Sequence, residues 1–194
     1  MKKIIARPKT TDPRFLLTQI EWETFSDYGG TSPLYATKML VQTDGENSNQ
    51  YYKWDRGSFT AYSRMKNVVK MMEEAERLGN SSYTALGKFF RAYHFYNLAL
   101  TFGDVPYSES LKGESDEVYS PKYDKQKDVL LGVLKELEEA NTILKTSNTT
   151  IEGDVIYNGD SGKWIKLINS FRLKILMMLS KKVSENDLNL KSSF

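Results

Sequence analysis

Apolar residues recur at helical spacing along most of this sequence, and this periodicity limits the chain to a helical architecture. The pattern is strongest after Ser82, where one wide apolar face consists of Leu86, Phe89, Phe90, Tyr93, Tyr96 and Leu100. Ala85, Ala92 and Ala99 repeat every seven residues beside this face. Small side chains at that spacing let a neighbouring helix approach closely, so we expect this segment to pack against other helices.

Segments with the same spacing cover residues 12–28, 32–42, 58–78, 120–144 and 164–182. A short turn joins the segment 58–78 to the strongly apolar segment, and the last two segments form a second pair. Two successive helical hairpins predict an all-α fold of tetratricopeptide-like hairpins with long loops, in a single helical domain over residues 1–194. The strict tetratricopeptide repeat signature is missing from the sequence.

Local signals indicate where several of these helices begin. A capping side chain followed by proline at the first helical position occurs at residues 12–13, 32–33 and 120–121. We therefore expect helices to start at these three places. The segment 145–162 is interpreted as a loop, with a short extended piece at residues 155–157.

Composition excludes several classes of function. The chain has 27 Lys and Arg residues against 25 Asp and Glu residues, and the basic side chains are scattered, which argues against binding to nucleic acid. Cysteine is absent, which excludes disulfides, thiol catalysis and thiolate metal sites. No segment approaches the roughly 20 apolar residues of a membrane span. The apolar run within the first ten residues, MKKIIARPKT, is too short for the apolar region of a secretory signal, so no export signal is predicted.

Candidate catalytic and metal-binding residues are sparse. His94 is the sole histidine, lies within a predicted helix, and has no carboxylate at ligand spacing, so a structural or surface role is expected. Asp44, Glu46, Ser48 and Asp55 loosely resemble a calcium loop, but the glycine is misplaced and the final glutamate is missing. The sequence therefore predicts no metal, no cofactor and no enzyme activity.

The sequence also contains two pairs of adjacent glutamates, which could in principle act as acid and base in catalysis. Glu73–Glu74 and Glu138–Glu139 lie on predicted helix faces that point to solvent. We interpret both pairs as solvated surface. A glycosidase would need two carboxylates facing each other across a cleft, and no pair of loop carboxylates in the sequence suggests one.

One polar loop combines aromatic rings with amide and charged side chains. Within the stretch TDGENSNQYYKWDRG, the candidate ligand-binding residues are Tyr51, Tyr52, Trp54, Asn47, Asn49 and Arg56. Sugar rings pack their C–H faces on aromatic planes while their hydroxyls bond to amides and guanidinium groups. The alternative interpretation is that the rings fold back and attach the loop to the helices.

Two long stretches resemble a known family. The segment YTALGKFFRAYHFYNLALTFGDVPYSESL, residues 83–111, is similar to the R-A-Y-x-F and Y/F-G-D-V-P-Y segment of the SusD/RagB family. The segment DVIYNGDSGKWIKLINSFRLKILMMLSKK, residues 154–182, is similar to that family's Y-x-G-D-x-x-K-W-x-K-x-x-N-S-x-R-L-R segment. Residues 120–129 and the stretch TTDPRFLLTQI also fit, so the resemblance covers most of the chain in the expected order.

The resemblance implies a nutrient-binding lipoprotein of the Bacteroidetes outer membrane, exposed at the cell surface. Such a protein holds an oligosaccharide, or in some members a peptide, above a SusC-like TonB-dependent transporter and performs no chemistry. In this family GDVPY is a fold signature, so Asp104 is expected to accept backbone or Arg91 hydrogen bonds, and Tyr107 to pack against the hairpin. The resemblance thus favours a structural role for this segment.

Two departures from the family pattern affect this interpretation. The lipobox cysteine and signal peptide are absent here, so lipid anchoring rests on the resemblance alone. Members also run far beyond position 194, so the chain looks like the N-terminal portion of a longer SusD-like protein, either a fragment or a truncated reading frame. The rival function from another class is a helical-repeat scaffold that binds only protein partners and no small molecule.

Overall fold

The computed structural model describes residues 10–26, 32–45, 57–113 and 116–182. Its helices are α1 (Pro13–Phe25), α2 (Ser32–Ala36), α3 (Thr60–Leu78), α4 (Ser81–Phe102), α5 (Gln126–Thr146), α6 (Ser161–Leu179) and the 3-10 helix η3 (Ser180–Lys182). Within these ranges the extended backbone pairs at one isolated antiparallel bridge, between Val105 and Asp124. The predicted all-α fold is therefore confirmed.

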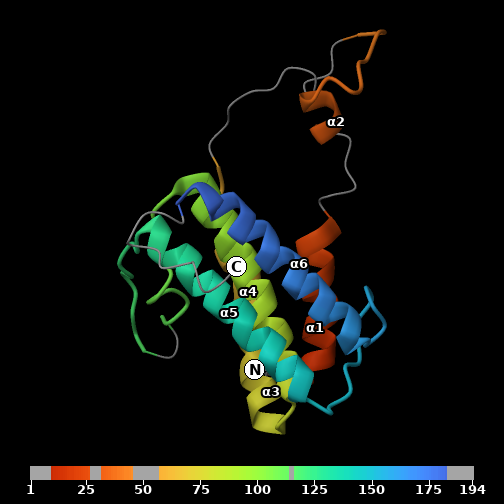
Figure 1. Cartoon of the computed structure of the whole chain (residues 1–194), viewed down its shortest axis with the longest axis vertical. Coiled ribbons are helices and arrows are strands. Elements are labelled where there is room, and N and C mark those ends of the chain that lie inside the picture. The colour runs from red at the N-terminus through yellow and green to blue at the C-terminus, as the bar shows by residue number, and fades with distance from the viewer. Residues whose placement is uncertain (1–9, 27–31, 46–56, 114–115, 183–194) are drawn as a thin grey trace, which may run out of the picture.

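Helix α4 lies at the centre of the bundle, where it contacts α3 and α5. α1 packs on α3 and α4, and α6 packs on α5. In Figure 1 α6 crosses in front of α4, and α2 stands apart from the other helices. The pairs α3–α4 and α5–α6 are the two hairpins that the sequence predicts. None of the described helices is both long and apolar enough to cross a membrane.

Aromatic side chains fill the core between α4 and α6. Trp164 of α6 is fully buried, and its ring centroid lies 5.6 Å from that of Phe89 and 5.8 Å from that of Phe90, both in edge-on geometry. Such pairs stabilise a core beyond the area that they bury. The alanines at positions 85, 92 and 99 are also fully buried, as their spacing predicts.

The first helix begins where the local signal places it, and it buries Leu17 and Ile20 in the core. The Asp12 side chain accepts a hydrogen bond from Arg14 N at 3.0 Å, and Pro13 is the first helical residue. Phe15 and Trp22 are 64% and 72% exposed, because α1 turns Leu17 towards α3 and α4 instead. The helix that starts at Ser32 ends at Ala36, before the predicted residue 42.

The predicted start of a helix at residues 120–121 is wrong. Helix α5 begins at Gln126, because the preceding residues are held in other interactions. Asp124 pairs with Val105 through two backbone hydrogen bonds, and its carboxylate accepts from the backbone of Tyr107 and Ser108 at 3.1 and 2.7 Å. The chain is therefore extended at the point where the sequence alone indicates a helical turn.

Asp104 supplies the missing cap of α5. Its Oδ1 accepts from Gln126 N at 2.9 Å and its Oδ2 accepts from Lys125 Nζ at 2.7 Å. The prediction that Asp104 accepts a backbone hydrogen bond is confirmed. Its charged partner is Lys125 and not Arg91, because the Arg91 side chain lies beside Glu136. Tyr107 packs on the α3–α4 hairpin as expected, with its ring edge-on to that of Phe95 at 4.8 Å between centroids, and its hydroxyl donates to Glu136 Oε1 of α5 at 2.6 Å. GDVPY is thus a structural connection between two helices.

The extended piece predicted at residues 155–157 is also wrong, because Asp154 bends the backbone around its carboxylate. Asp154 accepts from the backbone of Ile156, Tyr157 and Gly159, each at 2.9 Å, and from the indole of Trp164 at 2.7 Å. Burial acts to raise the pKa of Asp154, but these hydrogen bonds outweigh it and hold the pKa below its usual value. We call residues 154–160 the Asp154 turn.

Helix α1 holds the Asp154 turn through a second buried carboxyl group. Glu21 Oε2 accepts from Val155 N at 2.8 Å, and Thr18 donates to the carbonyl of Gly153 at 2.6 Å. Burial, opposed by the hydrogen bond from Val155 and assisted by the neighbouring Asp154 charge, raises the pKa of Glu21 to about 8. Glu21 is therefore protonated at neutral pH.

The prediction that Glu73–Glu74 and Glu138–Glu139 are solvated is wrong for Glu74, which is buried. The Glu74 side chain is 3% exposed and lies between Lys70 and Arg77 of the same helix, at 3.2 and 2.7 Å. Glu73, Glu138 and Glu139 are more exposed, and each pairs with a basic side chain. These contacts are structural ion pairs on the helix surfaces.

Candidate functional site

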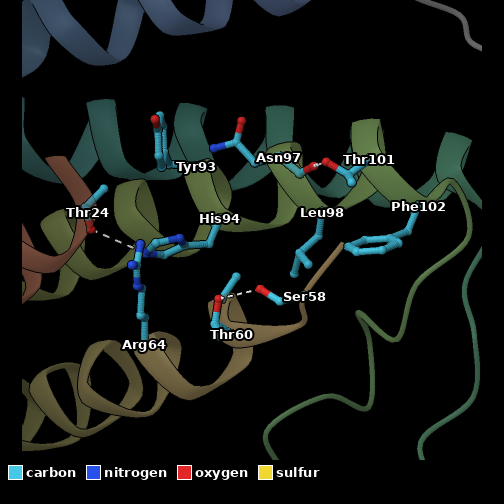
Figure 2. A pocket seen from close by; sticks show the side chains of 11 residues that line it. Thr24, Ser58, Thr60, Arg64, Tyr93, His94, Asn97, Leu98, Thr101 and Phe102 are labelled. Atoms are coloured by element: carbon cyan, nitrogen blue, oxygen red, sulfur yellow. Dashed lines mark hydrogen bonds between the residues drawn. The ribbon is translucent and has the colours of Figure 1, made fainter. Parts of the chain in front are cut away.

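A polar pocket of about 230 Å³ opens where the end of α1, the start of α3 and the second half of α4 meet. Its lining residues are Thr24, Ser58, Thr60, Ala61, Arg64, Tyr93, His94, Asn97, Leu98, Thr101 and Phe102. We call it the α4 pocket. Figure 2 shows Tyr93 and Asn97 along one edge of α4 and Thr60 and Arg64 across from them on α3.

Helical spacing brings these side chains to one place. Tyr93, Asn97 and Thr101 are separated by four residues each on α4, so they lie on one face one above the other. Thr60 and Arg64 have the same separation on the first turns of α3. The sequence folds this way because the buried alanine row of α4 allows its neighbours to approach closely.

His94 is the buried polar residue at the base of this pocket. It is 5% exposed, and its Nε2 lies 3.3 Å from the hydroxyl of Thr24, a contact visible in Figure 2. Burial, assisted by the charge of Arg64, lowers the pKa of His94 to about 4. The imidazole is therefore neutral at neutral pH and contributes hydrogen bonding without charge.

The described lining contains hydroxyl groups, one amide, one imidazole and one guanidinium, but no carboxylate. Ser58 and Thr60 hydroxyls lie 3.0 Å apart, and Thr101 donates to the carbonyl of Asn97 at 2.8 Å. Tyr93, Leu98 and Phe102 supply apolar surface beside these groups. This combination suits a ligand that has both hydroxyl groups and an apolar ring face.

The described lining residues include no carboxylate and no cluster of metal-binding side chains. No carboxylate lies beside the imidazole of His94 among the pocket residues, so a general acid paired with a base is not formed there. In the part of the chain that the structure describes, no group of three His, Cys, Asp or Glu side chains is placed to hold a metal ion.

A second, larger hollow of about 550 Å³ lies between α3 and α4. Its basic residues are already paired, because Lys88 Nζ lies 2.7 Å from Glu139 and Arg91 Nε lies 3.5 Å from Glu136. The α4 pocket is the better candidate for a polar ligand, since its described lining combines hydroxyl, amide and imidazole groups with the rings of Tyr93 and Phe102.

The six residues that the sequence proposes as ligand-binding lie outside the described residues. They are Tyr51, Tyr52, Trp54, Asn47, Asn49 and Arg56. The described chain starts again at Gly57, which follows Arg56 directly and lies against the ring of Phe102. Ser58 then lines the α4 pocket. Of the loosely calcium-like residues, Asp44 is exposed, and Glu46, Ser48 and Asp55 are not among the described ones.

Sequence reasoning missed most of the residues that the structure gathers here. His94 and Asn97 are polar residues three apart on an otherwise apolar helix, a signal that was visible in the sequence. Thr24 and Arg64 carry no such signal, because their place in the pocket depends on how α1 and α3 pack against α4.

Comparison with protein families identifies the chain. A family profile described as "starch-binding associating with outer membrane" matches residues 6–192, nearly the whole sequence. The chain belongs to the SusD-like family. The resemblance of residues 83–111 and 154–182 to SusD/RagB segments is thereby confirmed. No curated protein is similar to the SusD-like chain at a significant level.

Solved structures agree with this assignment. A SusD homolog from Bacteroides fragilis matches at 55% identity with a TM-score of 0.76, over 88% of this chain and 36% of that chain. A second SusD homolog from the same species matches at 32% identity with a TM-score of 0.82, over 95% of this chain and 39% of that chain. A chitin-binding protein matches at 35% identity with a TM-score of 0.55, over 64% of this chain and 26% of that chain. The chain thus spans well under half the length of these relatives.

Proposed function

We propose that this chain is the N-terminal portion of a non-catalytic SusD-like protein that captures an oligosaccharide at the cell surface. The captured nutrient passes to a SusC-like TonB-dependent transporter in the outer membrane, and a lipid anchor holds the whole protein beside it. The family description supports a place at the outer membrane and a glycan ligand. A solved relative that is named a chitin-binding protein supports the same class of ligand.

The observation that carries this proposal is the composition of the α4 pocket. Hydroxyl and amide groups stand beside the rings of Tyr93 and Phe102, and no carboxylate or metal cluster among the described lining residues suits catalysis. Sugar-binding sites need this mixture, because each ring presents hydroxyls around its edge and C–H groups on its faces.

The predicted aromatic stretch extends this site in the proposal. Trp54 precedes Gly57 by three residues, so chain length alone keeps its Cα within about 11 Å of the Gly57 Cα. Gly57 lies against Phe102, which lines the α4 pocket. We therefore assign Tyr51, Tyr52, Trp54, Asn47, Asn49 and Arg56 to the same ligand site, with the indole as its main platform.

The test removes that indole. Trp54→Ala should weaken oligosaccharide binding by about 1 to 3 kcal/mol, because one aromatic anchor is lost, while Tm stays nearly unchanged. Calorimetry with a panel of neutral and acidic oligosaccharides, including starch and chitin fragments, measures the affinity. Trp22→Ala is the matched control, since Trp22 is an exposed indole on α1 that does not line the α4 pocket.

Two results would contradict the assignment of Trp54. Full affinity in the Trp54→Ala variant would show that the indole makes no ligand contact. A large fall in Tm would instead support the alternative in which the ring attaches the loop to the helices, because removal of a buried ring costs stability.

The helical-repeat scaffold is the second candidate, and the outer surface of α6 favours it. Leu173 and Met177 are one turn apart and are 54% and 64% exposed. Exposed apolar side chains at that spacing suit contact with another protein surface. If the chain is a scaffold, no oligosaccharide in the panel binds, whereas Leu173→Lys disrupts association with a protein partner.

A further inference from the structure

We propose that the α4 pocket is the first of two adjacent sugar subsites, and that the ring of Phe59 is the platform of the second. One sugar ring then occupies the pocket, and the next ring of the same chain stacks on the outer face of Phe59. This inference rests on the proposed oligosaccharide-binding function and narrows its ligand from sugars in general to chains of at least two rings.

The volume of the α4 pocket limits what it encloses. At about 230 Å³ it is smaller than the sites of about 300 to 1,000 Å³ that hold drug-sized ligands, so it has room for one sugar ring. A longer chain therefore continues over the surface beside the pocket. Figure 2 shows Phe102 at the end of the pocket opposite to Thr24, and the surface next to Phe102 is within reach of a second ring.

Phe59 extends this end of the pocket outward. Its ring stacks on that of Phe102, with 4.3 Å between the centroids and 15° between the planes. Its sequence neighbours Ser58 and Thr60 both line the pocket. Gly57 allows the close approach, because a Cβ at that position would lie 2.7 Å from Cζ of Phe102. The two stacked rings therefore form one aromatic surface that starts in the pocket and ends outside it.

The ring of Phe59 is both exposed and held in place. The residue is 46% exposed although one face of its ring lies on Phe102. Tyr62 supports it from the side, at 6.0 Å between the ring centroids. Tyr62 is itself fixed, since it packs edge-on against buried Phe95 and donates from its hydroxyl to the carbonyl of Pro106 at 2.7 Å. A ring that is already ordered loses little conformational entropy when a ligand stacks on it.

The groups beside Phe59 suit a sugar better than an apolar protein surface. The hydroxyls of Ser58 and Thr60 lie 3.0 Å apart, and both residues are exposed. A sugar ring packs its C–H face on an aromatic ring while the hydroxyls around its edge bond to such groups. An apolar surface placed on Phe59 would instead remove water from both hydroxyls, which costs free energy.

The experiment measures how affinity depends on the length of the sugar chain. NMR titration of the 194-residue protein compares a monosaccharide with its trisaccharide, glucose with maltotriose and N-acetylglucosamine with tri-N-acetylchitotriose. In the series that binds, the Kd of the trisaccharide should be about tenfold lower than that of the monosaccharide. Phe59→Leu should raise the Kd of the trisaccharide about tenfold, because it removes the flat ring and keeps an apolar side chain.

The monosaccharide and two further variants serve as controls. The Kd of the monosaccharide should be unchanged in Phe59→Leu, which shows that the α4 pocket stays intact. Phe59→Tyr keeps a flat ring at the same place and should keep the affinity for the trisaccharide. Phe15→Leu makes the same change at an exposed phenylalanine of α1 that does not line the pocket, and it should alter neither Kd.

The other outcomes overturn the inference. An unchanged Kd of the trisaccharide in Phe59→Leu, or equal losses for both sugars, would show that Phe59 is no second platform, while the proposed sugar binding stands. Equal Kd values for the two sugars in the unchanged protein would lead to the same conclusion. If no saccharide of the whole panel binds, the proposed function itself fails, and the inference fails with it.

Discussion

The Asp154 turn and the α4 pocket both place polar groups among buried helices, but they satisfy those groups differently. In the turn, one carboxylate accepts four hydrogen bonds from three backbone N–H groups and an indole. In the pocket, the described hydroxyl, amide and imidazole groups line a hollow of about 230 Å³. The difference teaches that the Asp154 turn is a structural device, whereas the α4 pocket is the candidate binding surface because its lining is open to a ligand.

The largest expected effect breaks the turn. Asp154→Ala should lower the free energy of unfolding by about 3 to 5 kcal/mol, because the buried backbone donors and the Trp164 indole lose their acceptor. Thermal and urea unfolding measure this change. Asp160→Ala is the control from the same segment, since it removes the exposed cap of α6 and should cost only about 1 kcal/mol. Equal effects of the two variants would contradict a special role for Asp154.

The next largest effect is a pH dependence of stability that comes from Glu21, the carboxyl group that holds the Asp154 turn. The pKa of Glu21 is raised to about 8 in the folded protein, so its stabilisation is present below its ordinary value near 4.5 and is lost as pH rises through 8. The free energy of unfolding should therefore fall between pH 6.5 and 8, by at most about 1.4 kcal/mol per pH unit. Glu21→Gln should remove that slope, and its persistence would show that another group titrates.

His94 of the α4 pocket makes stability depend on pH in the opposite direction to Glu21. Its pKa is lowered from 6.5 to about 4, so its contribution to stability is present above pH 6.5 and is lost as pH falls through 4. His94→Gln should flatten the acid side of the stability profile and leave the fall between pH 6.5 and 8 unchanged. A change on the alkaline side in this variant would mean that the pocket and the Asp154 turn are coupled.

The smallest expected effect concerns the cap of α5. Asp104→Ala should lower Tm by a few degrees, because Gln126 N loses its acceptor while the exposed Lys125 gains water. Asp104→Asn keeps an acceptor for Gln126 N and should restore most of the loss. An unchanged Tm for Asp104→Ala would contradict the capping role.

The elements that the sequence predicts correctly are those set by neighbouring residues. Asp12 caps a helix that begins one residue later, and Gly79 ends α3 in a left-handed conformation with φ of 68°. The start of α5 was missed because its cap, Asp104, lies 22 residues earlier in the chain. Local patterns at Ser120 and Pro121 cannot report such a distant partner.

The candidate site was predictable only in part for the same reason. His94 and Asn97 stand out as polar residues on an apolar helix, whereas Arg64 and Thr24 enter the site through the packing of α3 and α1 against α4. The aromatic residues before Gly57 lie outside the described chain, so their part in binding stays a prediction.

The most direct test measures stability and binding in the same two variants. Asn97→Ala should weaken the binding of the oligosaccharide that the unchanged protein binds most tightly in the panel by about tenfold, with little change in Tm, because it removes a pocket amide. Asp154→Asn should lower Tm strongly while the remaining folded protein binds the sugar with unchanged Kd. Full sugar affinity in Asn97→Ala, or lost affinity in folded Asp154→Asn, would contradict the separation of the binding pocket from the structural turn.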